Sequence, residues 1–569
     1  MNKQLKGLQA SGGIAMAKAK VFIKAKLDIQ ARTILEKDIE NEIVRLEEAF
    51  KSYDQKLKSR ELLNEAEKAV NEAHIELLND PYFFDSAKEK ISNDKLDASR
   101  ALKETADQMV IVMESLDDPY LRERAADYRD IGQNLLYILE GIEAGDLSDL
   151  SENVIIVAEE LTPSDTSTMD KVHTLGLISE IGGKTSHVSI IAQTLGLPAL
   201  VGAKEACTHI KDGDFLILDA DNESIYINPS KDVIEKFKKK IEEETIEKER
   251  LEKIKHMDPV TKNGRAVEVV NNIGNLDDLK LGIESGGNGV GLFRTEFLYM
   301  DNTAFPDEKE QFEVYKEAAQ SLGDRPLIIR TLDIGGDKGL SYYEFPQEEN
   351  PFLGWRALRV CFDLPEIFRT QVRAILRAGF YGNVKILLPM IISVDEYIQV
   401  KDLVKDLEKE LEEEGKKFKK GLDIGVMIET PASIMMADQL AKHADYFSIG
   451  TNDLTQYILA VDRGNDKIAK LYNSYNPAVL RAIKRAIEAS HNEGKWCGMC
   501  GGFAGDTNAT YMLLGMGLDE FSVPASKVAK VKDIIINSDY NEAKEFADLI
   551  LSKSTVKEVE ELIEENQNR

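Results

Sequence analysis

The fold of this chain is decided by residues 446–457, which read Tyr446-Phe447-Ser448-Ile449-Gly450-Thr451-Asn452-Asp453-Leu454-Thr455-Gln456-Tyr457. The apolar run Tyr446–Ile449 predicts a buried strand, and polar residues follow it directly. Seven further apolar runs share this form, and helical patterns separate most of them. They are Ala266–Val270, Gly289–Leu292, Leu327–Ile329, Val384–Leu388, Ile424–Ile428, Trp496–Met499 and Glu520–Val523. Eight such units in about 280 residues predict a (β/α)8 TIM barrel.

Charged and polar residues follow five of the eight predicted strands. Arg294 comes after the second, Arg330 after the third, Glu429 after the fifth, Asn452 and Asp453 after the sixth, and Cys500 after the seventh. The carboxyl ends of TIM-barrel strands converge on one face, where active sites form. We therefore expect these side chains to share one site.

This set suits a substrate that carries a phosphate and a carboxylate. Arg294, Arg330 and Arg463 can bind phosphate oxygens through charge-assisted hydrogen bonds. Glu429 and Asp453 offer two carboxylates to an octahedral Mg²⁺ ion that shares the substrate's oxygens. Such a clamp stabilises charge in phosphoryl transfer. A single arginine is more often a surface ion pair, so the prediction rests on the set.

Cys500 has three interpretations. Its thiol can protonate a carbon centre or an enolate, which makes it a catalytic acid. It can be a structural thiol, or it can form a redox pair with Cys497, since the two make a lone Cys-x-x-Cys. A zinc site needs two more ligands, and no second pair of cysteines exists. We favour the acid and keep the structural and redox interpretations open.

A second stretch, Gly182-Gly183-Lys184-Thr185-Ser186-His187, precedes an apolar-periodic helix. Thr185 or Ser186 is a candidate N-cap, and Gly196 is a candidate C′ residue. His187 then falls in the first turn, where free N–H groups and the helix dipole favour an anion. Lys184 adds a cation, and the glycine pair lets the backbone approach a bulky group.

A neutral imidazole at this position is a good phosphoryl acceptor near pH 7, because its nitrogen is nucleophilic without a strong base. The alternative is that His187 is a capping-region histidine without chemistry. The other six histidines have no comparable setting. Three of them, His74, His256 and His491, lie in charged helical stretches and are expected on the solvated surface.

The rest of the chain divides by pattern. Few glycines and long charged-apolar stretches predict a helical bundle early in the chain. Short apolar runs predict strands at Val154–Ala158, Leu175–Ile178, Phe215–Leu218 and Ile225–Ile227, the last two as a hairpin. The strand-like segment Gly12–Ile23 can join these strands, which makes the bundle an insertion. Lys231–Lys255 predicts a charged linker helix that ends before Asp258-Pro259.

We therefore predict an α/β chain with five parts. Residues 1–24 and 146–230 form a phosphohistidine α/β domain, 25–145 the helical insertion, 231–260 the linker helix, 261–540 the TIM barrel, and 541–569 a C-terminal helical tail. His187 and the barrel site lie on different domains, whereas direct transfer needs reacting atoms at roughly 3–3.5 Å. We expect a domain reorientation during turnover, with the linker helix as its means.

Composition limits the function classes. A net charge of −29 over 569 residues argues against nucleic acid, whose phosphates need a basic face. The sequence contains no apolar run of 18 residues, so we expect no membrane span. Met1–Lys6 leads into polar sequence, so we expect no signal peptide. Four cysteines in 569 residues are too few for a disulfide framework, so we expect the protein to be located in the reducing cytoplasm.

Four long motifs carry a family resemblance. They are Gly182–His187, Gly289–Phe297, Asn350–Arg356 and Gly498–Gly501. On these motifs, and over essentially the whole chain, the sequence resembles enzyme I of the bacterial phosphoenolpyruvate-dependent phosphotransferase system.

The resemblance implies a reaction and its partners. His187 would take the phosphoryl group of phosphoenolpyruvate and pass it to a histidine of the phosphocarrier protein HPr, with release of pyruvate. The helical insertion would dock HPr, and the barrel would bind phosphoenolpyruvate and Mg²⁺ and form a homodimer. By position, the substrate would be bound by Arg294, Arg330, Arg356, Arg463, Asn452 and Asp453. Glu429 and Asp453 would bind the metal, and Cys500 would protonate the enolate.

The chain departs from the family pattern at three positions. Lys184 stands where arginine is common, Gly13 where proline is usual, and Gly502 where glutamate is common. Rival interpretations are an ATP-using relative such as pyruvate phosphate dikinase or phosphoenolpyruvate synthase, the nitrogen-branch paralogue, and a non-catalytic scaffold. No Gly-x-x-x-x-Gly-Lys-[Ser/Thr] loop supports ATP as the donor. The retained arginines, carboxylates and His187 argue against a scaffold.

Overall fold

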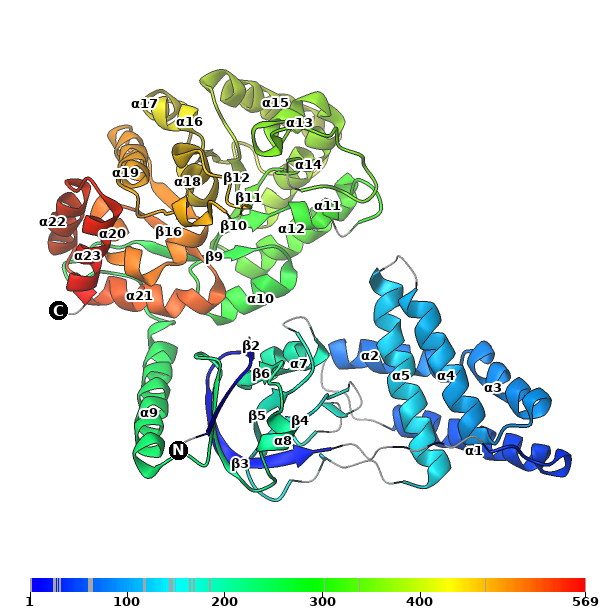
Figure 1. The fold of residues 1–569 in the computed structure, drawn as a ribbon. Helices are drawn as coiled ribbons and strands as arrows, with labels where there is room; N and C mark the ends of the chain where they lie inside the picture. The colour runs from blue at the N-terminus through cyan, green and yellow to red at the C-terminus, as the bar shows by residue number, and fades with distance from the viewer. Residues whose placement is uncertain are drawn as a thin grey trace. The chain divides into compact units, whose positions relative to one another are not determined.

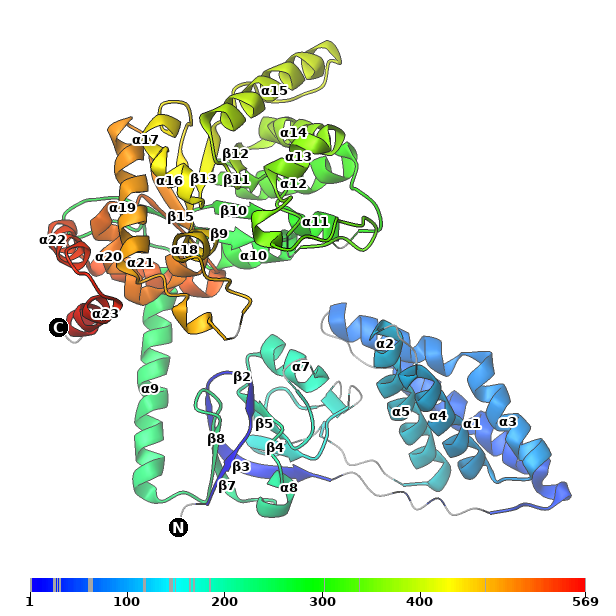
Figure 2. The same cartoon turned by 45° about the horizontal axis from the view of Figure 1, so that its top comes forward.

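The computed structural model describes residues 3–23, 27, 29, 32–59, 65–115, 119–142, 147–148, 150–162, 165–166, 169–183, 186–300, 302–336, 338–465 and 467–567. The chain forms two compact units, Met1–Glu244 and Thr245–Arg569. Figures 1 and 2 show the fold of each unit from two directions. Each unit has hydrophobic clusters of its own.

The second unit contains a closed barrel of eight parallel strands. They are β9 (Glu268–Ile273), β10 (Val290–Arg294), β11 (Pro326–Arg330), β12 (Asn383–Leu388), β13 (Ile424–Ile428), β14 (Phe447–Gly450), β15 (Cys497–Cys500) and β16 (Glu520–Val523). β16 pairs with β9 and closes the barrel. Every predicted apolar run contributes to one of these strands, which confirms the predicted (β/α)8 architecture.

Helices cover the outside of the barrel (Figure 2). They are α10 (Leu276–Glu284), α11 (Glu296–Met300), α12 (Glu308–Leu322), α13 (Leu358–Asp363), α14 (Pro365–Ala378), α15 (Val394–Glu413), α16 (Pro431–Met435), α17 (Ala437–Leu440), α18 (Thr451–Leu459), α19 (Pro477–Asn492), α20 (Thr507–Met516) and α21 (Val528–Asn537). Two C-terminal helices, α22 (Tyr540–Leu551) and α23 (Val556–Gln567), pack against α20. Gly515 permits this contact, because a Cβ there would collide with the Ala543 carbonyl.

Alternation along each strand sends side chains to two layers. In β15, Cys497 and Met499 belong to the large core that the helices share. Cys500 points the other way, into a smaller cluster inside the barrel that includes Leu292 and Tyr446. This alternation decides which side chains can reach the carboxyl-end site.

The first unit contains an eight-stranded mixed sheet with the order β1-β8-β7-β3-β4-β5-β6-β2. Its strands are β1 (Lys3–Lys6), β2 (Leu8–Ser11), β3 (Ile14–Phe22), β4 (Val154–Ala158), β5 (Thr174–Ser179), β6 (Ala199–Val201), β7 (Phe215–Asp219) and β8 (Ser224–Ile227). β7 and β8 form the predicted hairpin. β3 joins the sheet, as expected for the segment Gly12–Ile23, and it does so by parallel pairing with β4. The apolar patterns do not predict the short strands β1, β2 and β6.

The helical segment lies between β3 and β4 in the sequence. Its helices are α1 (Ile39–Lys58), α2 (Glu65–Leu78), α3 (Pro81–Asp94), α4 (Ala98–Glu114) and α5 (Pro119–Glu140). They share one hydrophobic cluster, in which Phe83 packs edge-on against Tyr128. The predicted helical bundle is therefore present, inserted between two neighbouring strands of the sheet.

The surface position predicted for His74 is wrong. The residue is fully buried, and its Nε2 lies 3.2 Å from Asp127 Oδ1. His74 shares the buried face of α2 with Asn71 and Leu78, because residues three to four apart lie on one side of a helix. The charged residues that suggested exposure occupy the other faces. His256 and His491 are exposed, as predicted.

Helix α9 (Lys231–Ile254) is the predicted linker helix, and the boundary between the two units falls within it. In the first unit, Phe237 is buried and its ring centroid lies 5.2 Å from that of Tyr226. In the second unit, Arg250 donates to both carboxylate oxygens of Asp533, at 2.5 and 2.6 Å. The middle of the helix, residues 242–249, is exposed throughout.

Lys532 provides a second anchor for the carboxyl end of α9, in addition to the ion pair of Arg250. Lys532 is buried, and its Nζ donates to the carbonyls of Lys255, Met257 and Gly286 at 2.7–3.1 Å. A cation at this end also complements the helix dipole. In the part of the chain that the structure describes, no helix is long and apolar enough to span a membrane.

Candidate functional site

One cavity of about 570 Å³ lies at the carboxyl ends of the barrel strands. The eight barrel residues proposed from the sequence all line it: Arg294, Arg330, Arg356, Glu429, Asn452, Asp453, Arg463 and Cys500. Their positions follow from the strand ends. Arg294, Arg330 and Cys500 end β10, β11 and β15, while Asn452 and Asp453 lie in the first turn of α18, which follows β14 directly. Glu429 directly follows β13, and Arg356 and Arg463 come from loops.

Arg356 is the most strongly held of these side chains. It is 1% exposed, and its Nε and Nη2 donate to the two carboxylate oxygens of Asp333 at 2.8 and 3.0 Å. Its Nη1 and Nη2 also donate to Asp453, at 3.2 and 3.0 Å. One guanidinium thus bridges two carboxylates, and its planar fork is what makes this possible.

Gly335 lets the loop that carries Arg356 come close. It adopts φ +94°, and a Cβ there would collide with the carbonyl of Trp355. Only glycine takes this conformation without strain. The loop is thereby brought next to Asp333, the partner of Arg356.

A second group of charges surrounds Arg330. Its Nη2 donates to Glu296 Oε1 at 2.6 Å, and its Nη1 lies 3.1 Å from Asp333 Oδ2. Lys338 Nζ donates to the same two carboxylates at 3.0 Å each. Glu296, Asp333 and Lys338 are cavity residues that the sequence reasoning missed. Glu296 lies within the Gly289–Phe297 motif, and Asp333 follows β11 by three residues, so both carried a usable signal.

The two buried acids stay ionised. Burial alone would raise the pKa of Glu296, but the charges of Arg330 and Lys338 outweigh it and leave that pKa lowered. Burial likewise opposes ionisation of Asp333, whose pKa is nevertheless held well below its usual value by Arg330, Arg356 and Lys338. The cavity wall is therefore a fixed lattice of opposite charges, which needs little reorganisation when an anion binds.

Glu429 differs from Glu296 and Asp333 because its pKa is raised rather than lowered. It is buried, and its Oε1 accepts a hydrogen bond of 2.7 Å from the backbone N–H of Met390. Gly450 leaves room for it, since a Cβ there would lie 2.5 Å from Glu429 Oε2. Burial, with the nearby carboxylates Asp453 and Asp333, raises the pKa of Glu429 to about 8.

Glu429 and Asp453 fit a divalent metal by their chemistry. Both are oxygen donors in one cavity, and the repulsion between their charges is what a cation relieves. Among the residues that the structure describes, no cluster of three or more histidine, cysteine or acidic side chains could hold a metal by itself. An ion here would need further oxygens from a substrate or from water, as Mg²⁺ commonly does.

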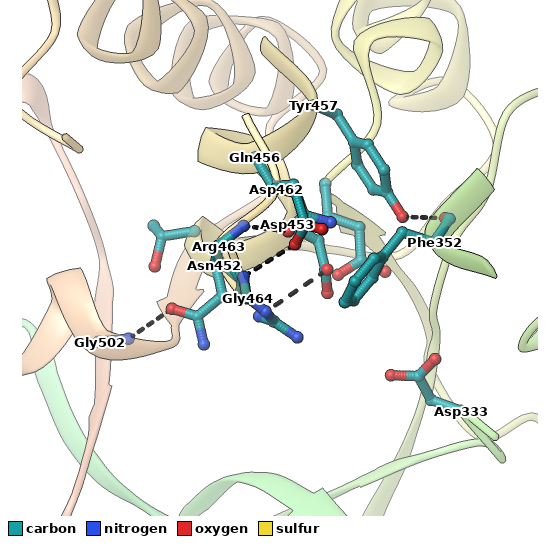
Figure 3. A network of polar contacts seen from close by, with 12 residues as sticks. Asp333, Phe352, Asn452, Asp453, Gln456, Tyr457, Asp462, Arg463, Gly464 and Gly502 are labelled. Atoms are coloured by element: carbon teal, nitrogen blue, oxygen red, sulfur yellow. Dashed lines mark hydrogen bonds and ion pairs between the residues drawn. The ribbon is translucent and has the colours of Figure 1, made fainter. Parts of the chain in front are cut away.

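Arg463 and Asn452 belong to the network of polar contacts around Asp453 (Figure 3). The backbone N–H of Arg463 donates to Gln456 Oε1 at 3.0 Å, and its Nη1 lies 3.9 Å from Asp453 Oδ1. Asn452 Oδ1 accepts a hydrogen bond of 3.1 Å from the backbone N–H of Gly502. Arg294 is more exposed and lies over the ring of Phe297, at 5.5 Å.

Cys500 lies at the inner wall of the cavity. It is 2% exposed, and its Sγ lies 3.7 Å from Ser448 Oγ and 3.7 Å from the carbonyl of Ile449. Burial raises the pKa of this thiol to about 12, so it carries its proton at neutral pH. Cys497 points to the opposite face of β15, and both cysteines are free. The Cys-x-x-Cys spacing therefore forms no redox pair in this fold.

His187 is the first residue of α7 (His187–Leu195) in the first unit. Ser186 has the extended backbone of an N-cap, but its Oγ lies 3.0 Å from Ser189 Oγ rather than bonding a backbone N–H. The buried Ser189 donates to the Gly183 carbonyl at 2.8 Å, which ties the glycine pair to the helix. Gly196 ends the helix in the left-handed conformation, as predicted. Lys184 and Thr185 lie outside the described residues.

Sequence comparisons place these two units in one family. Models of PEP-utilising enzymes match residues 248–540 (PEP-binding domain), 6–124 (N-terminal) and 150–223 (mobile domain). The phosphoenolpyruvate-protein phosphotransferase of Listeria innocua is 43% identical over 569 residues, 99% of each chain. That of Haemophilus influenzae is 44% identical over 566 residues, 99% of this chain and 98% of the relative. That of Bacillus subtilis is 43% identical, covering 99% of both chains.

The chain belongs to the phosphoenolpyruvate-protein phosphotransferase family. It is therefore an enzyme that transfers a phosphoryl group, and this family is the one predicted from the motifs. The match to the PEP-binding domain spans all eight barrel strands and the cavity, and the match to the mobile domain includes His187.

Two departures from the phosphotransferase pattern have a structural setting here. Gly13 adopts φ +108° between β2 and β3, a conformation that the proline ring forbids, so this turn differs from one built on proline. Gly502 donates its backbone N–H to Asn452, and the nearest atom to a Cβ there would be Asn452 Oδ1, at 3.6 Å. Cys500 is held by β14 rather than by a side chain at position 502.

Proposed function

We propose that this phosphotransferase takes the phosphoryl group of phosphoenolpyruvate onto His187, releases pyruvate, and passes the group to a histidine of HPr. The observation that supports the donor site most is the barrel cavity. It combines five cationic side chains, two buried carboxylates suited to a metal, and a protonated thiol at its inner wall. A substrate with phosphate, carboxylate and an enol carbon uses all three.

The arginines bind and orient the donor. Arg294, Arg330 and Arg463 bind phosphate oxygens, while Asn452 offers an amide to the carboxylate end. Arg356 lies deeper, and its bonds to Asp333 and Asp453 fix it before the substrate arrives. Pre-set donors of this kind stabilise the negative charge on the transferring phosphoryl oxygens and the charge that develops on the enol oxygen as the P–O bond breaks.

Glu429 and Asp453 hold Mg²⁺ in this proposal. When bound, the ion neutralises part of the negative charge on the transferring phosphoryl group. Cys500 acts after the P–O bond has broken. Its S–H bond breaks and the proton forms a C–H bond at the enolate methylene, so that pyruvate leaves and a thiolate remains.

His187 receives the phosphoryl group because its neutral ring nitrogen carries a lone pair. The P–N bond forms as the P–O bond of the donor breaks. The amino end of α7 then faces an anion, which the helix dipole stabilises. Transfer to HPr regenerates the imidazole. We assign the docking of HPr to the helical insertion, the homodimer contact to the barrel unit, and the reaction to the cytoplasm.

The test is a labelling experiment with two donors. We expect the protein to take up label from [³²P]phosphoenolpyruvate in the presence of Mg²⁺, in an acid-labile and base-stable form that maps to His187. Label from [γ-³²P]ATP should not be taken up. Labelling by ATP would favour a dikinase-like enzyme, and no labelling by either donor would favour a scaffold.

A further inference from the structure

Phe352 and Tyr457 lie beside the donor cavity, and the proposed reaction gives them no task. The described residues that line the cavity include Arg356 and Arg463 but neither of these two. Both are partly buried, and each contacts an arginine of the cavity. Their contacts indicate that they act on the substrate through those arginines.

Helix α18 presents three side chains to the two loops that carry these arginines. Asp453, Gln456 and Tyr457 are spaced at i, i+3 and i+4, so they share one face of the helix. Arg356 Nη1 donates to Asp453 and to the Tyr457 hydroxyl, at 3.2 and 3.5 Å. The backbone N–H of Arg463 donates to Gln456 at 3.0 Å. One helix face therefore contacts both loops.

The Tyr457 hydroxyl makes two hydrogen bonds to the loop of Arg356. It accepts from the Arg356 guanidinium and donates to the backbone carbonyl of Phe352, and Figure 3 shows the second of these bonds. A hydroxyl can do both at once because it carries one proton and two lone pairs. The loop is thus held at two of its residues by one atom of α18.

The ring of Phe352 contacts the second loop. The guanidinium carbon of Arg463 lies 5.8 Å from the ring centroid, within the range of a cation–π contact. The ion pair between Arg463 and Asp453 is long, at 3.9 Å, and Asp453 already accepts two hydrogen bonds from Arg356. We therefore expect the face of the Phe352 ring to help determine where the Arg463 guanidinium lies.

Polar contacts, rather than burial, hold the turn around Phe352. Leu353, the next residue, is 65% exposed. The carbonyls of Leu353 and Gly354 accept hydrogen bonds from Arg359 at 2.8 and 2.7 Å. The bond from Tyr457 extends this set of contacts to Phe352 itself.

We propose that Tyr457 and Phe352 are positioning residues that hold Arg463 against the phosphoryl group of the donor. The proposal rests on the proposed function, in which Arg463 binds phosphate oxygens. The Tyr457 hydroxyl fixes the backbone of Phe352, and the Phe352 ring orients the guanidinium. Neither residue touches the substrate. The segment Asn350–Arg356 thus supplies one arginine of the site and orients another.

A double-mutant cycle separates this role from a general structural one. Tyr457→Phe removes one hydroxyl and should lower kcat/KM for phosphoenolpyruvate about 10-fold, chiefly through KM. Arg463→Ala should lower it about 100-fold or more. In the Arg463→Ala background, Tyr457→Phe should have an effect of less than about twofold, because the group that it positions is gone.

Variants of Phe352 test the second contact. Phe352→Leu keeps an apolar side chain without an aromatic face and should lower kcat/KM about fivefold, again without effect in the Arg463→Ala background. Phe352→Tyr keeps the face and should stay within about twofold of wild type. The matched control is Tyr342→Phe, which removes another hydroxyl that donates to a backbone carbonyl, that of Tyr299 at 2.9 Å. It should behave as wild type.

Other results would overturn the proposal. If Tyr457→Phe lowers kcat/KM by the same factor with and without the Arg463 side chain, its hydroxyl does not act through Arg463. Wild-type kinetics of Tyr457→Phe, or equal losses in Phe352→Leu and Phe352→Tyr, also contradict it. If Arg463→Ala itself keeps a normal kcat/KM, the phosphate-binding role of Arg463 in the proposed function fails instead, so the two failures are distinguishable.

Discussion

The donor cavity and the start of α7 differ in how their reactive groups are held. In the cavity, Arg330 and Arg356 each contact two carboxylates at 3.2 Å or less, and both are almost fully buried. At α7, His187 begins a nine-residue helix whose N-cap makes no side-chain bond to the backbone. The proposed binding groups are held by ion pairs, whereas the proposed acceptor is the first residue of a short helix.

This difference matches the tasks that we assign to the two regions. Binding a small, highly charged donor rewards pre-set charges, since any reorganisation would cost part of the binding energy. In the proposed reaction His187 serves two partners, phosphoenolpyruvate and HPr, from the first position of a helix. We therefore expect changes at α7 to abolish transfer without loss of donor binding, and changes in the cavity to affect the donor half-reaction alone.

The largest expected effect is that of His187→Ala. Without a ring nitrogen there is no acceptor, so transfer from phosphoenolpyruvate to HPr should fall below detection. Binding of phosphoenolpyruvate with Mg²⁺, measured by calorimetry, should stay within about twofold of wild type, because the binding groups lie in the other unit. His209→Ala, at the end of α8 (Ala206–His209) in the same unit, removes a partly exposed ring that contacts Glu205 and should transfer normally. Wild-type transfer by His187→Ala would remove the central proposal.

The second effect sharpens the comparison inside the cavity. Arg356→Lys keeps the charge but loses the planar fork that donates to both carboxylate oxygens of Asp333 and of Asp453. We expect kcat/KM for phosphoenolpyruvate to fall roughly 100-fold, with phosphoryl exchange between His187 and phosphorylated HPr unchanged. Arg325→Lys, near the amino end of β11, is the matched control and should behave as wild type. If exchange with HPr also fell, the two regions would not be independent.

The third effect concerns the thiol at the inner wall. Cys500→Ala should lower kcat for pyruvate formation by at least about 100-fold with KM within about threefold, because a proton donor acts in the transition state. Cys497→Ala removes the thiol that points to the outer core and should keep kcat. Equal losses in both variants would mark a structural thiol, and a change in KM alone would mark a binding residue.

The sequence predicted the strands of the barrel better than the ion pairs that hold its cavity residues in place. Strands β13 and β16 have the predicted limits, because a buried parallel strand is a short apolar run between clear breaks. The eight cavity residues were placed by one rule, that polar residues at strand ends meet. Glu296 and Asp333 lie in a motif and after a strand, but the sequence does not show that they hold Arg330 and Lys338 in place, and this is why these partners were missed.

The first unit shows the opposite limit. Strands β1, β2 and β6 have three or four residues each, too few for alternation to be recognised. The prediction for His74 was wrong because a single polar residue among charged neighbours has the sequence pattern of a solvated helix face. Only the packing of α2 shows that this residue is buried. In each case tertiary contacts, rather than local pattern, decide the outcome.

The linker helix is fixed at both of its ends. The sequence names the linker helix as the means of reorientation without a flexible point, and in the structure Arg250 and Lys532 fix its carboxyl end to the second unit. The amino end is fixed to the first unit through Phe237. A reorientation between the units would then use the exposed middle, residues 242–249.

The smallest expected effect tests this division. A fragment of residues 1–244 should have the same free energy of unfolding as residues 1–255, within about 0.5 kcal/mol, and should exchange phosphoryl groups with phosphorylated HPr equally well. Residues 245–255 have their described partners, Asp533 and Lys532, in the second unit, so a lone first unit gains nothing from them. A fragment of residues 1–230 is the control, because it also loses Phe237 and should be less stable by roughly 2–3 kcal/mol.

Neither longer fragment should accept the phosphoryl group of phosphoenolpyruvate, since both lack the cavity. If residues 1–255 were markedly more stable than residues 1–244, the end of α9 would belong to the first unit. The flexible point would then lie at Asp258-Pro259 rather than in residues 242–249.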